Sequence, residues 1–134
     1  DGELAEWVKQ NTTSEISYVG YQSRQQMQQL YLTCKAVIFP SIWLEGMPMA
    51  IIEAESAGAI PIVARTQTTQ QMIVENENGF LYEPGDVTEL VEAIAKFEEK
   101  SIIELNRISN NARNRFLKEY EEKQHMEFVE RLYN

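Results

Sequence analysis

The sequence predicts an α/β fold in which a Rossmann-like parallel sheet is flanked by helices. Residues 36–39, Ala-Val-Ile-Phe, are apolar at every position, which is typical of a strand inside a parallel sheet. Pro40 ends this strand, Pro48 stands where a helix can begin, and Gly58 is suited to end that helix. A second apolar run follows at residues 60–64. Strand, loop, helix and strand in this order are the repeating unit of a parallel sheet.

The remaining segments supply elements around this unit. We expect one domain over residues 1–134, with an α/β core in 1–100 and C-terminal helices in 101–134. Apolar spacing and capping residues predict helices at about 4–10, 24–33, 72–74 and after Asp86 or Thr88, strands at 16–20 and 79–82, and C-terminal helices through 112, at 116–120 and at 126–133.

Composition narrows the classes of partner. The chain has 134 residues, a formal net charge of −9 and a pI near 4.6, which argues against binding to nucleic acid or to an anionic membrane surface. A single cysteine, Cys34, fits a protein of a reducing compartment. Cys34 itself is expected to be a small buried side chain. No apolar run is long enough to cross a membrane and no signal peptide opens the chain. We therefore expect a cytoplasmic protein without an integral membrane segment.

The loop and helix at residues 40–58 form the predicted ligand site. Ligands of open α/β sheets bind beyond the carboxyl ends of the strands, where a helix N-terminus offers free N–H groups to an anion. Glu45 precedes the helix and Glu53 lies one turn inside it, so that two hydroxyl-accepting carboxylates flank the anion site. Hydroxyl groups on both sides of phosphates describe a sugar nucleotide.

Four segments in this order carry a family resemblance. FPS at 39–41, EGMPMAIIE at 45–53, AGAIPIVA at 57–64 and NGFLYEPGD at 78–86 resemble the C-terminal, donor-binding domain of family 4 of the retaining glycosyltransferases, which have the GT-B fold. The similarity runs from about residue 16 to residue 97. It implies transfer of a hexosyl group from a nucleoside diphosphate sugar to an acceptor, in the synthesis of a glycan, glycolipid or polysaccharide.

The resemblance also implies roles for individual residues. The catalytic residue would be Glu45, in contact with the donor sugar, and Glu53 would hold the ribose hydroxyls. Two departures from the family pattern leave the acceptor side open: Thr68-Thr69 replaces a frequent glycine pair, and Met72 replaces a frequent glutamate. Pro48 replaces a frequent glycine and removes one potential amide donor, although EGMP also fits the family pattern. The backbone amides implied to contact the sugar and the diphosphate belong to Gly46, Met47, Met49 and Ala50.

Three further donor-binding candidates each have two interpretations. Tyr21, after the glycine that ends the predicted strand at 16–20, either lines the nucleotide base or covers a core edge. Ser41 either reaches the ligand or, as we favour, caps the loop. Arg65, at the carboxyl end of the strand at 60–64, either meets a phosphate or solvates a loop beside acidic neighbours. Trp43 is not a donor-binding candidate. It either packs under its loop or lines an acceptor groove.

The resemblance implies no cofactor, since the donor is a substrate. The residues imply no metal, because no Asp-x-Asp occurs and one histidine with scattered carboxylates makes no recognisable ligand set. It also implies that the first strand, helix and second strand of the domain are missing before Asp1. In the order 3-2-1-4-5-6, strands 16–20 and 36–39 would be third and fourth, and would not pair directly. The acceptor, a glycan or a lipid-linked molecule, would bind through a missing N-terminal domain. Peripheral contact with the inner membrane surface, through that missing domain, stays open. The segment alone is expected to be inactive.

Two other classes of function fit the same features. A sugar-nucleotide epimerase or a phosphorylase of the same fold would differ in whether an acceptor is consumed. A non-catalytic binding module would keep the core and lose the chemistry, and the presence of both Glu45 and Glu53 speaks against it. The donor base, the sugar, the acceptor and the oligomeric state are not fixed by the sequence.

Overall fold

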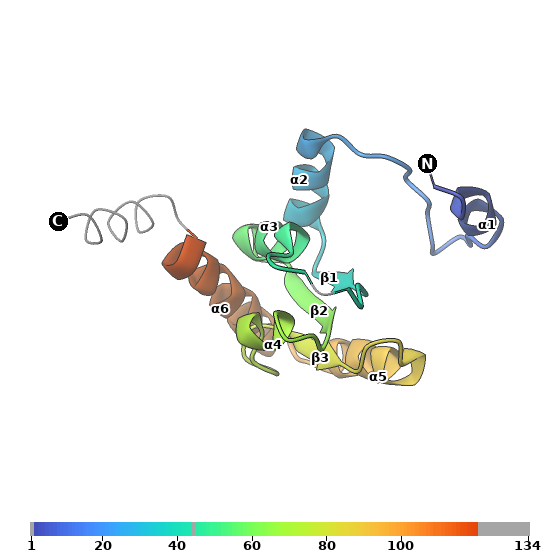
Figure 1. The fold of residues 1–134 in the computed structure, drawn as a ribbon. Helices are drawn as coiled ribbons and strands as arrows, with labels where there is room; N and C mark the ends of the chain where they lie inside the picture. Colours follow the sequence, from blue (N-terminus) through green and yellow to red (C-terminus); the bar gives the residue numbers. More distant parts are fainter. Residues whose placement is uncertain (1, 44, 121–134) are drawn as a thin grey trace.

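A computed structural model describes residues 2–43 and 45–120. Its three strands form one parallel sheet in the order β1-β2-β3, in which Ile38 lies opposite Ile62 and Ile62 lies opposite Phe80. This arrangement confirms the predicted α/β fold (Figure 1). The elements are α1 (Ala5–Gln10), α2 (Arg24–Thr33), β1 (Ala36–Phe39), α3 (Met49–Ala57), β2 (Ile60–Ala64), α4 (Thr69–Met72), β3 (Phe80–Tyr82), α5 (Val87–Glu98) and α6 (Ile102–Tyr120).

Helices cover both faces of the sheet, because alternate residues of each strand point to opposite sides. Figure 1 shows α3 and α5 on opposite sides of β2. Ile62 and Phe80 pack on one face against α5 and the first half of α6, whereas Val63 and Leu81 pack on the other against α3, α4 and the end of α6. A third cluster joins α2 to α3. The strand at β2 is therefore buried at every position, as its sequence predicts.

The helix ends follow the local signals in the sequence. Ser23 and Gln26 form a capping box at the start of α2, and Asp86 accepts a hydrogen bond from the Glu89 N–H at the start of α5. Helix α3 begins directly after Pro48 and ends at Gly58, whose φ of 78° lies in the left-handed region that glycine adopts without strain. These boundaries confirm the predicted helices, including the one that carries Glu53.

The predicted strand at residues 16–20 is wrong, because this segment has no regular secondary structure. It runs as an extended connection from α1 to α2, apart from the sheet (Figure 1). A strand forms only when a neighbour accepts and donates its backbone hydrogen bonds, and no described strand lies beside this segment. Within the described residues, β1 pairs only with β2, so direct pairing of 16–20 with β1 does not occur.

The predicted break between two helices near residues 112–116 is also wrong. Helix α6 is continuous from Ile102 to Tyr120, since the sequence places neither glycine nor proline in this range. The helix crosses the turns that precede β2 and β3, where Ser109 donates a hydrogen bond to the Gly58 carbonyl at 2.6 Å and Arg107 donates one to the Asn76 carbonyl at 2.9 Å. The helix predicted at 126–133 lies outside the described residues.

The backbone at Gly79 leaves no room for a side chain. Its replacement by alanine tests how closely the start of β3 packs against the sheet. An added Cβ would lie 2.6 Å from the Pro61 carbonyl oxygen and 3.0 Å from a methyl carbon of Ile73. We expect Gly79→Ala to lower the free energy of unfolding by about 1–3 kcal/mol, measured by urea denaturation. Gly46→Ala, where an added Cβ meets nothing within 4 Å, is the control and should change stability by less than about 0.5 kcal/mol. Equal stability of the two variants would contradict this account.

Candidate functional site

The loop between β1 and α3 lies at the carboxyl edge of the sheet and carries the first predicted site residue. The Glu45 side chain accepts a hydrogen bond from the Ser41 hydroxyl at 2.9 Å. Its backbone carbonyl accepts another from the Thr68 hydroxyl at 2.5 Å. Glu45 is therefore held from two directions, by the end of β1 and by the segment that starts α4. The Ser41 contact agrees with the favoured interpretation of a loop cap.

The four residues predicted to supply amides lie together where α3 begins. The first amides of a helix have no partner inside it, so the N–H groups of Met49 and Ala50 are not bonded within α3. The side chains of Met47 and Met49 are exposed. Because this helix has no acidic residue in its first turn, its N-terminal partial charge is not offset there. The arrangement suits an anionic ligand.

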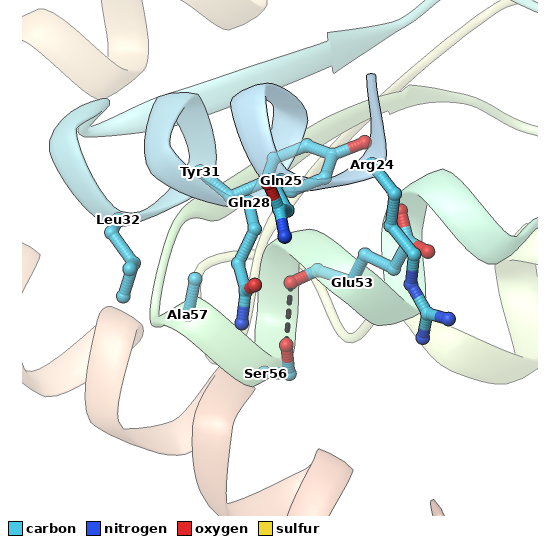
Figure 2. Close-up of a pocket in the computed structure, with 8 residues that line it drawn as sticks. All are labelled: Arg24, Gln25, Gln28, Tyr31, Leu32, Glu53, Ser56 and Ala57. Atoms are coloured by element: carbon cyan, nitrogen blue, oxygen red, sulfur yellow. Dashed lines mark hydrogen bonds between the residues drawn. The ribbon is translucent and has the colours of Figure 1, made fainter.

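Glu53 lines a pocket of about 320 Å³ between α2 and α3. Figure 2 shows Arg24, Gln25 and Gln28 of α2 around the same space as Glu53 and Ser56 of α3, and its dashed line marks the hydrogen bond from the Ser56 hydroxyl to the Glu53 carbonyl, at 2.7 Å. Burial, and then the charge of Glu53, raise the pKa of the Tyr31 phenol above its ordinary value. Tyr31, Leu32 and Ala57 also line the pocket.

Two predicted donor-binding residues lie apart from this group. The Tyr21 side chain is 83% exposed, which does not fit the interpretation that it covers a core edge. Arg65 follows β2, and its Nε lies 2.9 Å from a carboxylate oxygen of Glu83. This ion pair agrees with the interpretation that Arg65 solvates a loop beside acidic neighbours. The structure thus places Glu45, the start of α3 and Glu53 on one loop–helix unit that follows β1.

The main polar cluster that sequence reasoning missed centres on Glu55. Its side chain is fully buried, and the Arg115 Nε donates to one carboxylate oxygen at 2.8 Å while Nη2 donates to the other. Burial raises the pKa of the Glu55 carboxyl above its ordinary value. Burial is the largest influence on the Arg115 guanidinium and lowers its pKa, but the hydrogen bonds and charges of Glu55 and Tyr120 together outweigh burial and raise that pKa. A glutamate among the Ala and Ile residues of α3 indicates that a buried carboxylate requires a cationic partner. The local sequence does not identify that partner.

A second pocket, of about 210 Å³, lies between the β1–α3 loop and the end of α6. Gly46 and Met47 of the loop line it together with Arg115 of α6, and its other lining residues are Thr68, Gln71, Met72, Glu119 and Tyr120. Thr68 and Met72 are two of the positions where the sequence departs from the family pattern.

Among the described residues, no three His, Cys, Asp or Glu side chains gather as a metal site. No described helix is both long and apolar enough to cross a membrane.

An open parallel sheet with a loop and helix start at its carboxyl edge defines the class of α/β domains that bind ligands beyond the strand ends. Comparison with known proteins gives the family. The model of the family described as "Glycosyl transferases group 1" matches residues 4–115. The chain belongs to this family.

One curated relative and several solved structures are similar to the chain. The relative, the UDP-Gal:alpha-D-GlcNAc-diphosphoundecaprenol alpha-1,3-galactosyltransferase of Escherichia coli, is 30% identical over 124 residues, which cover 87% of this chain and 30% of the relative. The chain therefore spans about a third of the length of that enzyme.

The structural similarity is close although the sequences have diverged. Sucrose-phosphate synthase from Thermosynechococcus elongatus has a TM-score of 0.83 at 21% identity, covering 97% of this chain and 33% of the other. HepE from Anabaena, solved in complex with UDP-glucose, has a TM-score of 0.80 at 22% identity, covering 98% of this chain and 36% of the other. These structures confirm the fold of the chain.

Proposed function

We propose that the chain is the C-terminal, donor-binding domain of a family 4 retaining glycosyltransferase of GT-B fold. The intact protein would transfer a hexosyl group from a nucleoside diphosphate sugar to an acceptor in glycan, glycolipid or polysaccharide synthesis. The observation that carries this proposal is the placement of Glu45 and Glu53 on either side of the start of α3, at the carboxyl edge of a parallel sheet. A carboxylate on each side of an anion site matches a ligand with hydroxyls at both ends of a diphosphate.

In this proposal the donor lies across the start of α3. The first-turn amides, those of Met49 and Ala50 with Gly46 and Met47 before them, bind the diphosphate, since the helix end concentrates free N–H groups and partial positive charge. Glu45 contacts the hexose and acts as the catalytic residue. Glu53 binds the ribose hydroxyls at the mouth of the α2–α3 pocket. Tyr21, which is exposed, borders the base end, and Ser41 contributes by holding Glu45. Arg65 keeps its ion pair with Glu83 outside the donor contacts.

The proposed donor is a UDP-hexose and the proposed acceptor is a lipid-linked sugar diphosphate. UDP-Gal and a diphosphoundecaprenol acceptor stand in the name of the E. coli relative, and HepE was solved with UDP-glucose. No cofactor is needed, because the donor already carries an activated sugar. The acceptor would be bound by a second domain outside this chain. That domain would bring a cytoplasmic enzyme to the inner membrane surface. The transfer reaction is therefore tested with the intact protein.

Glu53→Ala is expected to weaken the binding of the bare nucleotide. Loss of a charged hydrogen bond to the ribose hydroxyls should lower the binding free energy of UDP by ~1–3 kcal/mol. Isothermal titration calorimetry of the intact protein with UDP measures it directly. Glu92→Ala, at an exposed position of α5 outside both pockets, is the matched control and should bind UDP like the wild type. An unchanged UDP affinity in a folded Glu53→Ala protein would show that the ribose assignment is wrong.

A further inference from the structure

The buried Glu55–Arg115 ion pair joins α3 to α6 with a defined geometry. The Arg115 side chain is 12% exposed and that of Glu55 is not exposed at all. The guanidinium grips both carboxylate oxygens of Glu55, and its Nη1 donates to Glu119 at 2.8 Å. Asn78, in the turn before β3, donates to Glu55 at 3.4 Å and to the Met72 carbonyl at 2.9 Å. Three segments distant in the sequence therefore meet at one carboxylate.

The ion pair supplies directional information that the neighbouring core does not. Ile51 and Ile52 of α3 pack with Phe116 of α6 in an apolar cluster, and such packing is non-directional and tolerates sliding. A two-pronged guanidinium–carboxylate contact is satisfied at one register only. Burying two charges gains little stability by itself. The contribution of the ion pair is therefore to define the position of α3 along α6.

That position matters because the two halves of the proposed donor site have different supports. Glu45 is held by Ser41 and Thr68, which belong to the β1–α3 loop and to the segment that starts α4. The first-turn amides and Glu53 belong to α3 itself. The distance from the hexose contact to the diphosphate contacts is therefore set by how α3 is seated. Arg115 also lines the pocket that Gly46 and Met47 border, so it shares that pocket with the loop.

We propose that Arg115, acting through Glu55, is a positioning residue that sets the start of α3 relative to Glu45 and so aligns the donor for transfer. This inference rests on the proposed function. A misplacement of about 1 Å between reacting groups can lower a rate by about 100-fold. The positioning role concerns turnover more than the binding of UDP, because Glu53 and the amides of Met49 and Ala50 move together with α3, and only Gly46 and Met47 belong to the loop.

The test replaces the pair by apolar residues of similar volume. Glu55→Met combined with Arg115→Met removes both charges, and such replacements of buried pairs leave stability unchanged or improved. In the intact protein, with UDP-galactose as donor and a GlcNAc-diphosphate lipid as acceptor, we expect kcat to fall at least tenfold. The melting temperature should stay at or above that of the wild type, and the Kd for UDP should change less than threefold. Glu6→Met with Lys9→Met, at an exposed ion pair of α1, is the matched control with wild-type kcat.

Each outcome decides the proposal. Wild-type kcat in a folded double variant overturns the positioning role and leaves the proposed function standing. If wild-type protein releases no UDP on addition of any acceptor lipid, both proposals fail. If the double variant does not fold, Arg115→Lys decides, because lysine keeps the charge but loses the two-pronged grip. We expect it to lower kcat severalfold at an unchanged UDP affinity, and an unchanged kcat overturns the proposal.

Discussion

Replacing Glu45 by glutamine in the intact protein is expected to lower kcat about 100-fold, the size of effect seen when one electrostatic contact to a transition state is lost. The substitution keeps the shape of the side chain and its contact with the Ser41 hydroxyl, which donates to Glu45 at 2.9 Å. It removes the negative charge beside the reacting sugar. The measurement is steady-state release of UDP from a UDP-hexose in the presence of acceptor.

The contrast with Glu53 makes this prediction specific. Glu45→Gln should leave the Kd for UDP unchanged, since UDP lacks the hexose, whereas Glu53→Ala should raise that Kd. Ser41→Ala serves as an intermediate case, because it frees the Glu45 carboxylate without removing it. A Glu45→Gln enzyme with wild-type kcat would exclude Glu45 from the chemistry, and a weakened UDP affinity would move it to the nucleotide side of the site.

Replacing Phe80 by alanine is expected to lower the free energy of unfolding by about 3–5 kcal/mol, as large-to-small changes of buried aromatic residues do. Phe80 is fully buried in β3, and its ring meets that of Phe97 edge to face, with 6.2 Å between the ring centroids. Chemical denaturation followed by circular dichroism measures the loss.

Two comparison variants locate the origin of that loss. Phe80→Leu keeps most of the apolar volume and should lose less stability than Phe80→Ala. Val74→Ala removes methyl groups from a side chain that is 55% exposed, and should change the free energy of unfolding by less than about 0.5 kcal/mol. If Phe80→Ala were no worse than Val74→Ala, the cluster between β3 and α5 would not be the main core.

The parts of the fold predicted from the sequence are those that local signals determine. The capping box at Ser23, the left-handed Gly58 and the unbroken apolar runs at β1 and β2 act within a few residues, and each was placed where the structure has it. The segment at 16–20 has the composition of a strand but not the partners of one. Strand formation depends on neighbours, so composition alone predicted the wrong state there.

The candidate site shows the same division. Glu45 and Glu53 are close in sequence and lie on one loop–helix unit, so their shared edge follows from the spacing. Arg115 lies 60 positions after Glu55, and no local pattern links them. Glu55 lies two residues after Glu53 and therefore on another side of α3, and that side faces the interior of the domain. Contacts of this range depend on how α6 crosses the molecule, which periodicity does not encode.

The sequence distance between Glu55 and Arg115 has a consequence for how the chain is made. At synthesis rates of about 5–20 residues per second, the 60 residues between them take about 3–12 s to appear. Throughout that interval α3 has been synthesised while the cation that pairs with its buried carboxylate does not yet exist. The helix that carries the donor contacts cannot take its final seat in the nascent chain until nearly the whole of α6 has followed it.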